Sequence, residues 1–180
     1  MSESILSPEA VVRSFGLKPG DVVADFGAGH GFFTVPIAVA VGSTGKVYAI
    51  DVQKSVLEII RSRARQNHIT QIEARWADLD QPQGSGLPDE SVDAVLIANI
   101  LFQAEQKENI FAEAYRILRP GGKAIVIEWD ETPSALGPPV GLRISKSKAE
   151  DLAKRAGFAR DSECDSGAHH YGFFVLKPSL

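Results

Sequence analysis

The feature that most constrains this chain is a glycine-rich loop directly after a short apolar run. The run is Val22-Val23-Ala24-Asp25-Phe26, and glycines follow it at positions 27, 29 and 31. Glycine lets the backbone turn sharply and approach a ligand without interference from a Cβ atom. The pattern predicts a β-strand that ends in a ligand-binding loop.

The spacing of these glycines narrows the class of ligand. A dinucleotide-binding loop follows the pattern G-x-G-x-x-G, whose third glycine packs a helix against the strand. Here the glycines lie two residues apart and Asp25 precedes them. The spacing therefore argues against a dinucleotide, although glycine-rich turns also arise for purely structural reasons.

Length and composition suit one soluble domain. The 180 residues are 44% hydrophobic and 23% charged, and the apolar stretches are too short to span a membrane. The first four residues lack the basic start of a signal peptide, so we expect a cytoplasmic protein. A net charge of −4 makes nucleic acid a poor default partner. Cys164 is the sole cysteine, and we expect no disulfide and no metal site.

Helical and strand patterns alternate along the chain. Ser7 and Pro8 open a leading helix, and the apolar run 32–41 predicts a buried helix whose start Pro36 delays or distorts. Further strands are predicted at 46–51, about 72–76, within 87–99, at 123–129, 158–164 and 171–177, and further helices at about 54–66, 104–118 and from a capping box at 147–150. The Pro- and Gly-rich stretch 131–144 predicts an exposed connection. This alternation is typical of an α/β fold with a doubly wound, mostly parallel sheet.

Three polar residues follow predicted strands, at Asp51, Asp78 and Asn99. Because the carboxyl ends of parallel strands meet at one edge of a sheet, we expect them near the glycine loop. A carboxylate at Asp51 could accept both ribose hydroxyls of a nucleoside, and Asp78 could accept an adenine amino group with Leu79 against the ring. A plain turn aspartate is the alternative at both positions.

Five motifs occur in the order and at the spacings of the class I S-adenosylmethionine (SAM)-dependent methyltransferases, over about residues 21–130. They are Asp25-Phe26-Gly27-Ala28-Gly29-His30-Gly31, Asp51, Trp76-Ala77-Asp78, Leu87-Pro88 with Ser91-Val92-Asp93-Ala94-Val95, and Arg116-Ile117-Leu118-Arg119-Pro120-Gly121-Gly122. The last two are most similar to the branch that contains the ubiquinone/menaquinone-biosynthesis methyltransferases.

The resemblance implies a Rossmann-like fold, with seven strands, helices on both faces and an antiparallel last strand. It divides the single domain 1–180 into a leading helix (1–20), a cofactor-binding core (21–130) and a substrate-side loop with a terminal hairpin (131–180). It implies SAM as the cofactor, held at its methionine end by the glycine loop and the backbone near Asn99. The site residues carried over are Asp25, Gly27, Ala28, Gly29, Asp51, Val52, Asp78, Leu79 and Asn99.

The implied reaction is methyl transfer to a small molecule, with an apolar or lipid-like acceptor as one option. Asn99-Ile100-Leu101-Phe102 lacks the prolines found in many methyltransferases that act on amide or base nitrogens. Arsenite methyltransferases need several cysteines, which this chain lacks. Segments that could cover an acceptor are the leading helix and residues 100–106, 131–144 and 165–170. The alternatives are a SAM- or nucleoside-binding module without transferase activity and an NAD(P)-dependent oxidoreductase.

No catalytic residue is assigned from the sequence. Methyl transfer is an in-line displacement that positioning alone accelerates strongly, so a general base is not required. The candidate bases are His30, Glu128, Asp130, His169 and His170, and for each we expect a loop or surface role instead.

Overall fold

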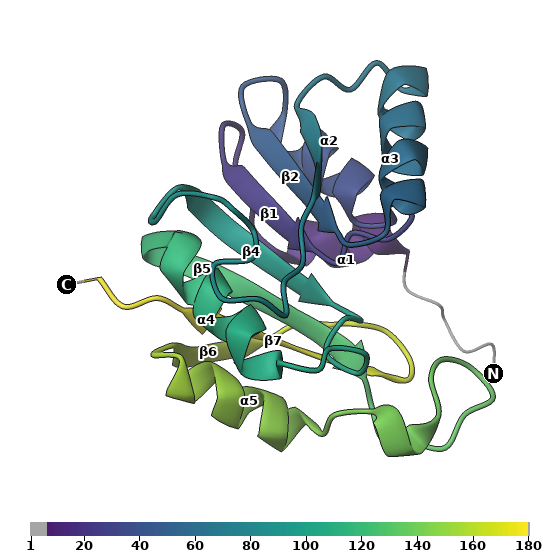
Figure 1. The fold of residues 1–180 in the computed structure, drawn as a ribbon, viewed down its shortest axis with the longest axis vertical. Coiled ribbons are helices and arrows are strands. Elements are labelled where there is room, and N and C mark those ends of the chain that lie inside the picture. Colours follow the sequence, from purple (N-terminus) through teal and green to yellow (C-terminus); the bar gives the residue numbers. More distant parts are fainter. Residues whose placement is uncertain (1–6, 180) are drawn as a thin grey trace.

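The computed structural model describes residues 7–179, which contain one seven-stranded sheet with helices on both faces (Figure 1). The strands are β1 (Val22–Phe26), β2 (Lys46–Asp51), β3 (Ile72–Trp76), β4 (Val92–Ala98), β5 (Leu118–Trp129), β6 (Ala159–Glu163) and β7 (His170–Leu176). Their order is β3-β2-β1-β4-β5-β7-β6. The first five strands pair in parallel, and β7 is antiparallel to β5 and β6. The predicted doubly wound fold with an antiparallel last strand is confirmed.

The strand order reverses between β1 and β4. From β1 the chain winds outward through β2 to β3, and it then returns to β4 on the other side of β1. In open α/β sheets a crevice forms at such a point, outside the carboxyl ends of the strands, because the flanking connections leave in opposite directions. The fold therefore places a ligand site beyond the ends of β1, β2 and β4.

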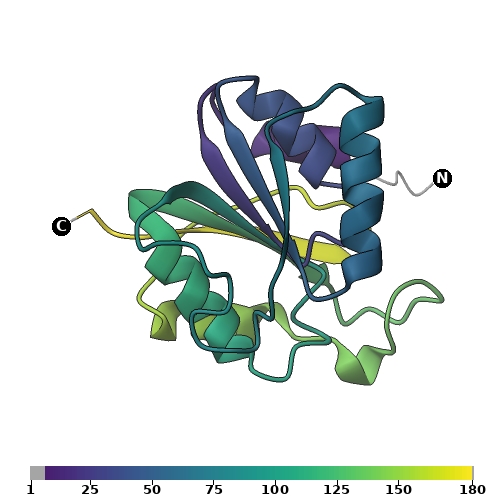
Figure 2. The ribbon, with the colours of Figure 1, turned by 45° about the horizontal axis from the view of Figure 1, so that its top comes forward.

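The helices form two layers. On one face lie α1 (Pro8–Ser14), α2 (Thr34–Val41) and α3 (Lys54–Gln66), and on the other lie α4 (Lys107–Ile117) and α5 (Lys146–Arg155) (Figure 1 and Figure 2). A short 3-10 helix, η1 (Val140–Leu142), precedes α5. Alternate side chains of β4 enter the two layers, which explains its almost wholly apolar sequence. No helix within residues 7–179 has the length and apolar character needed to cross a membrane.

The helices α1 and α2 begin as the sequence predicts. The Ser7 hydroxyl accepts a backbone N–H from the first turn and so caps α1. The run 32–41 becomes helical only at Thr34, which places Pro36 in the first turn of α2. A proline there removes no helical hydrogen bond, because the first N–H groups of a helix have no partner within it.

The predicted capping box at the start of α5 is wrong. The helix begins at Lys146, and the side chain of Ser145, not of Ser147, accepts the Lys148 N–H at 3.3 Å. Ser145 is extended and follows the buried Ile144, so the packing of the preceding chain decides which serine is the last extended residue. A capping pattern in the sequence does not show that Ile144 is buried, so it cannot predict which serine caps the helix.

The junction between α4 and β5 also differs from the prediction. α4 begins at Lys107 rather than at about residue 104, and β5 begins at Leu118 rather than Lys123. Leu118 pairs with Val92, and regular pairing resumes where Lys123 meets Ala94. The Pro-Gly-Gly turn between these pairs therefore bulges out of the sheet ladder instead of ending the strand.

The connection 131–144 was expected to be exposed, and this is wrong for Arg143 and Ile144, which are buried. The Arg143 guanidinium is at the centre of the loop and donates to four backbone carbonyls at 2.8–2.9 Å. These carbonyls belong to Asp130, Thr132, Leu136 and Pro138. One side chain thus folds this segment into a compact loop above the end of β5.

Candidate functional site

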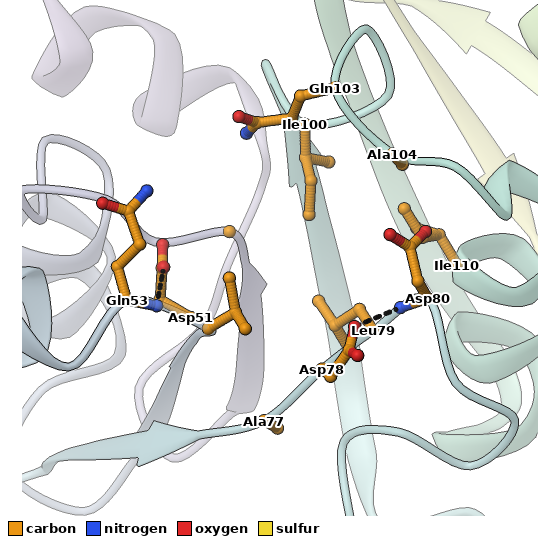
Figure 3. Close-up of a pocket in the computed structure, with 12 residues that line it drawn as sticks. Asp51, Gln53, Ala77, Asp78, Leu79, Asp80, Ile100, Gln103, Ala104 and Ile110 are labelled. Carbon is orange, nitrogen blue, oxygen red and sulfur yellow. Dashed lines mark hydrogen bonds between the residues drawn. The ribbon is translucent and has the colours of Figure 1, made fainter.

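A cleft of about 180 Å³ lies at the predicted switch point, beyond the carboxyl ends of β1, β2 and β3 (Figure 3). The residues that line it are Gly27, Asp51, Val52, Gln53, Ala77, Asp78, Leu79, Asp80, Ile100, Gln103, Ala104 and Ile110. Figure 3 shows Asp51 and Gln53 on one side of the cleft and Asp78 to Asp80 on the other.

Asp51 ends β2 and organises one side of the cleft. Its Oδ2 accepts the Gly29 N–H at 2.9 Å, and its Oδ1 accepts the Gln53 N–H at 2.8 Å. Each carboxylate oxygen can accept more than one hydrogen bond, so both retain capacity toward the cleft. The position suits a pair of hydroxyl donors.

The glycine loop is tight and its amides are largely engaged within the protein. Gly27, Gly29 and Gly31 have φ of 71°, 51° and 79°, which glycine adopts without strain. The N–H groups of Gly27 and Ala28 both donate to the Ile50 carbonyl, and that of Gly31 donates to the Ala28 carbonyl. A phosphate cradle instead points several free N–H groups at its ligand. The loop therefore suits a cofactor without phosphate groups.

Asp25 lies behind this loop rather than in the cleft. Its side chain is buried, and its Oδ2 accepts the Thr34 hydroxyl at 2.6 Å. Burial raises the pKa of Asp25 to about 6; the Thr34 hydrogen bond opposes the shift and the charge of Asp51 adds to it. The carboxylate thus ties the end of β1 to the first turn of α2.

The opposite side of the cleft combines carboxylates with apolar walls. The Asp78 carboxylate accepts the Asp80 N–H at 3.0 Å, and Asp80 in turn accepts the Gln106 N–H at 2.8 Å, at the start of α4. Leu79, Ile100, Ala104 and Ile110 provide apolar lining. A flat base between apolar side chains, with an amino group near a carboxylate, fits this donor and acceptor pattern.

Five of the nine predicted site residues converge on the cleft, namely Gly27, Asp51, Val52, Asp78 and Leu79. Asp25, Ala28, Gly29 and Asn99 do not line it. The sequence reasoning missed the lining residues Gln53, Ala77, Asp80 and Ile110, and it anticipated Ile100 and Gln103 only as a loop beside the ligand. The missed residues follow known motif positions or belong to a helix face, and no spacing rule marks them.

A second cavity, of about 260 Å³, lies beyond the ends of β4 and β5. It is lined by Pro8, Val11, Phe33, Asn99, Ile127, Trp129, Leu136 and residues 166–170. Its lining includes residues of the leading helix and of the segments 131–144 and 165–170, three of the four segments expected to cover an acceptor. Asn99 lines this cavity and Ile100 lines the first, so consecutive residues border the two cavities.

The polar groups of the second cavity are few. The Asn99 Oδ1 is buried and has no hydrogen-bond partner among the described residues. The Nδ1 of His170 lies 3.0 Å from the Ala168 carbonyl, and its ring packs against the Trp129 indole with centroids 4.1 Å apart. Burial lowers the pKa of His170, which favours the neutral imidazole. The cavity therefore suits a mainly apolar molecule with one or two polar groups.

Three of the other candidate bases lie outside the second cavity. His30 is exposed, and the Asp130 carboxylate accepts the Thr132 N–H at 2.9 Å within the loop. The expectation of a loop or surface role is wrong for Glu128, whose side chain is completely buried. His169 lines the second cavity together with His170.

The fold and the cleft together define a nucleoside-cofactor-binding α/β protein of the doubly wound class. The family model described as "Methyltransferase domain" matches residues 23–122, more than half of the chain. The chain belongs to this family. Its fold matches that of a SAM-dependent methyltransferase, and its curated relatives include ubiquinone/menaquinone C-methyltransferases. SAM is the cofactor of such methyltransferases.

Individual relatives agree with this assignment. A ubiquinone/menaquinone biosynthesis C-methyltransferase from Hydrogenovibrio crunogenus is 31% identical over 67% of this chain and 47% of that protein. An arsenite methyltransferase from Halobacterium salinarum is 30% identical over 64% of this chain and 29% of that protein. A SAM-dependent methyltransferase crystal structure from Aquifex aeolicus superposes with a TM-score of 0.87 at 26% identity, covering 96% and 90% of the two chains. The chain thus spans half or less of these two curated relatives.

Proposed function

We propose that this chain binds SAM in the first cleft and catalyses transfer of its methyl group to a small, mainly apolar molecule in the second cavity. The observation that carries the proposal is that two consecutive residues, Asn99 and Ile100, border the two cavities. The first cavity presents carboxylates that follow β2 and β3, and the second has a mainly apolar lining. Such an arrangement brings a cofactor and an acceptor together at one point, which is the main requirement of in-line transfer.

The cofactor roles follow the donor and acceptor chemistry of the cleft. Asp51 accepts the two ribose hydroxyls, Asp78 accepts the adenine amino group, and Leu79 packs on the base. The glycine loop and the backbone near Asn99 hold the methionine end, and Asp25 supports that end from behind the loop. When bound, SAM would supply an electrophilic methyl group: a bond from the acceptor atom to the methyl carbon would form as the carbon–sulfur bond breaks, with S-adenosylhomocysteine as the leaving group. The engaged amides of the loop weigh against the NAD(P)-dependent alternative.

The acceptor is defined by the second cavity. Val11, Phe33, Ile127 and Trp129 give it apolar walls, and Ser166 and His170 add polar side chains to its lining. An apolar ring bearing a hydroxyl group, or an apolar chain with a polar head, meets these requirements. The single thiol, Cys164, does not supply the set of thiolates that a metalloid acceptor needs.

Calorimetric titration with SAM tests the cofactor assignment. The wild-type chain is expected to bind SAM, and Asp51→Ala is expected to weaken binding by about 10- to 100-fold, since two hydrogen bonds to a charged acceptor are lost. Asp21→Ala is the matched control. Asp21 also accepts a backbone N–H, from Lys18, but it lies in the turn before β1, at the amino ends of the strands and away from the cleft. Binding of NADH instead of SAM would refute the proposal.

Transfer is tested separately with labelled SAM and an acceptor panel. Hydroxylated aromatic rings and lipid-like molecules are expected to gain label in the presence of wild-type protein but not of Asp51→Ala. A protein that binds SAM but labels no molecule in the panel or in a cell extract would favour the binding module without transferase activity.

A further inference from the structure

Glu128 is a completely buried acid near the end of β5 that the cofactor and acceptor assignments do not use. Its Oε1 accepts two successive backbone N–H groups, from Ile100 at 2.7 Å and from Leu101 at 2.6 Å. Its Oε2 is buried and has no hydrogen-bond partner among the described residues. Burying a carboxylate with only one oxygen satisfied is costly, so we asked what this arrangement achieves.

The segment that Glu128 holds forms one wall of the cofactor cleft. Ile100 lines the cofactor cleft, and its carbonyl accepts the N–H groups of Gln103 and Ala104, which line the cleft as well. Ile100 also packs directly on the backbone of Gly27. The position of the whole wall therefore depends on the two N–H groups that Glu128 accepts.

A charged acceptor holds these N–H groups more firmly than a neutral one. Hydrogen bonds to a carboxylate are shorter and about twice as strong as neutral hydrogen bonds. The residue before this wall, Asn99, has a φ of 53°, in the left-handed region that asparagine occupies more often than most other non-glycine residues.

We propose that Glu128 is a positioning residue for the cofactor: its negative charge holds residues 100–104 as the wall of the cleft, and SAM binds more weakly when that charge is lost. The inference rests on the proposed SAM site. It adds that a residue outside both cavities sets the affinity of the first.

The surroundings of Glu128 allow its charge to change near neutral pH. Burial raises the pKa of Glu128 to about 7, and the backbone hydrogen bonds from Leu101 and Ile100 oppose that shift. The other charged group that bears on it is Lys107, at the start of α4, which favours the carboxylate. Tyr171, its pairing partner on β7, donates its hydroxyl to the Ile144 carbonyl and is neutral in this pH range, because burial raises its pKa. Above pH 7 the carboxylate is charged and the wall is held; below pH 7 the protonated acid holds it less firmly.

The test is SAM affinity by calorimetry from pH 6 to pH 8.5 in wild type, Glu128→Gln and Glu128→Asp. The ratio of the Glu128→Gln Kd to the wild-type Kd is expected to be about tenfold at pH 8 and to fall toward one at pH 6. Because both proteins contain the same other titratable groups, taking the Kd ratio at each pH cancels the effect of those groups on SAM affinity. Glu128→Asp keeps the charge with a shorter reach, so its affinity should fall between the two and retain the pH dependence.

Two controls separate positioning from general damage. Asp93→Asn makes the same acid-to-amide change at an aspartate that accepts the Val22 N–H at 2.8 Å, at the amino end of β4, and should leave SAM affinity unchanged. Because Glu128→Gln removes a buried charge, its unfolding midpoint at pH 8 should equal or exceed that of wild type. Amide hydrogen exchange at Ile100 and Leu101 should nevertheless quicken relative to wild type at pH 8.

The outcomes are distinct. Equal SAM affinity of wild type and Glu128→Gln at pH 8, or a Kd ratio that does not change with pH, overturns the inference and leaves the SAM site intact. A loss of affinity in Glu128→Gln that is matched by loss of folding, with slow exchange at Ile100 and Leu101 in the remaining folded protein, overturns it too. Failure of wild type to bind SAM overturns the proposed function itself.

Discussion

The Thr34 hydroxyl donates a 2.6 Å hydrogen bond to the Asp25 carboxylate, with both residues buried. Asp25 belongs to the strand that feeds the glycine loop, and Thr34 begins the helix that follows the loop. The bond therefore closes the loop at its base. The pKa of Asp25 is raised to about 6 despite it, because burial disfavours the charged carboxylate more than one hydroxyl favours it.

Because of this pKa shift, we expect Asp25 to destabilise the folded protein more as the pH rises. Between about pH 4 and pH 6 the folded state binds more protons at Asp25 than the unfolded state, so the free energy of unfolding falls as the pH rises. Asp25→Asn removes this titration. Relative to wild type, the variant is expected to gain up to about 3 kcal/mol in the free energy of unfolding between pH 4 and pH 7, measured by urea denaturation.

The partner residue provides the control for this prediction. Thr34→Val removes the donor that favours the charged carboxylate, so the decline in stability should steepen and extend to higher pH, whereas Thr34→Ser should behave like wild type. A difference between Asp25→Asn and wild type that stays constant across the pH range would contradict the assignment of the shift to Asp25.

A second prediction concerns the contact between Gly27 of the glycine loop and Ile100 of the cleft wall. A Cβ atom at Gly27 would lie 2.8 Å from the Ile100 Cδ1, and the φ of +71° disfavours any L side chain. Gly27→Ala is expected to lower the free energy of unfolding by about 1–3 kcal/mol and to weaken SAM binding.

The double variant with Ile100→Ala separates the two causes of this loss. In the Ile100→Ala background the backbone strain of Gly27→Ala remains but the contact with the Ile100 side chain is removed, so we expect Gly27→Ala to cost less there than in wild type. Equal losses in the two backgrounds would show that the contact with Ile100 has no energetic consequence.

The parts of the fold that could be predicted from sequence are those set by local chemistry. The apolar run before Asp25, the glycine spacing and the acid after β2 each depend on residues close together in the chain, and parallel pairing brings them to one edge. The position of the cleft could be predicted because Asp51 and Asp78 both lie at the carboxyl ends of parallel strands.

The parts that could not be predicted depend on partners far apart in the chain. Glu128 accepts two backbone N–H groups from residues 27 and 28 positions away. Because every residue except proline has a backbone N–H group, the sequence does not indicate which ones a buried acid will contact. The same applies to Ser145, whose capping role is set by the burial of Ile144 before it. Four residues that line the cleft, Gln53, Ala77, Asp80 and Ile110, were missed for a related reason. They line it because the fold places them there, and no motif in the sequence marks them as binding residues.

Arg143 gives the last prediction, on the loop that borders the second cavity. Its guanidinium donates to four carbonyls of residues 130–138 and lies 5.5 Å from the centre of the Trp129 ring, while Gly137 packs on the same indole. Lysine has a charge but no planar array of donors, so it cannot reach these carbonyls together. Arg143→Lys is therefore expected to lower the free energy of unfolding by about 1–3 kcal/mol.

The same change should be visible locally by hydrogen exchange. Amides of residues 131–142 are expected to exchange faster in Arg143→Lys than in wild type, while those of β1 and β4 stay protected, because the loop lies outside the sheet. Arg119→Lys is the control, since the Arg119 guanidinium is half exposed and pairs with Asp93 at the surface, where a lysine can replace it at a cost below about 1 kcal/mol. If loop exchange in Arg143→Lys matched wild type, the four hydrogen bonds would not be what holds the loop against Trp129, and the wall of the second cavity would have to be held by the packing of Gly137 alone.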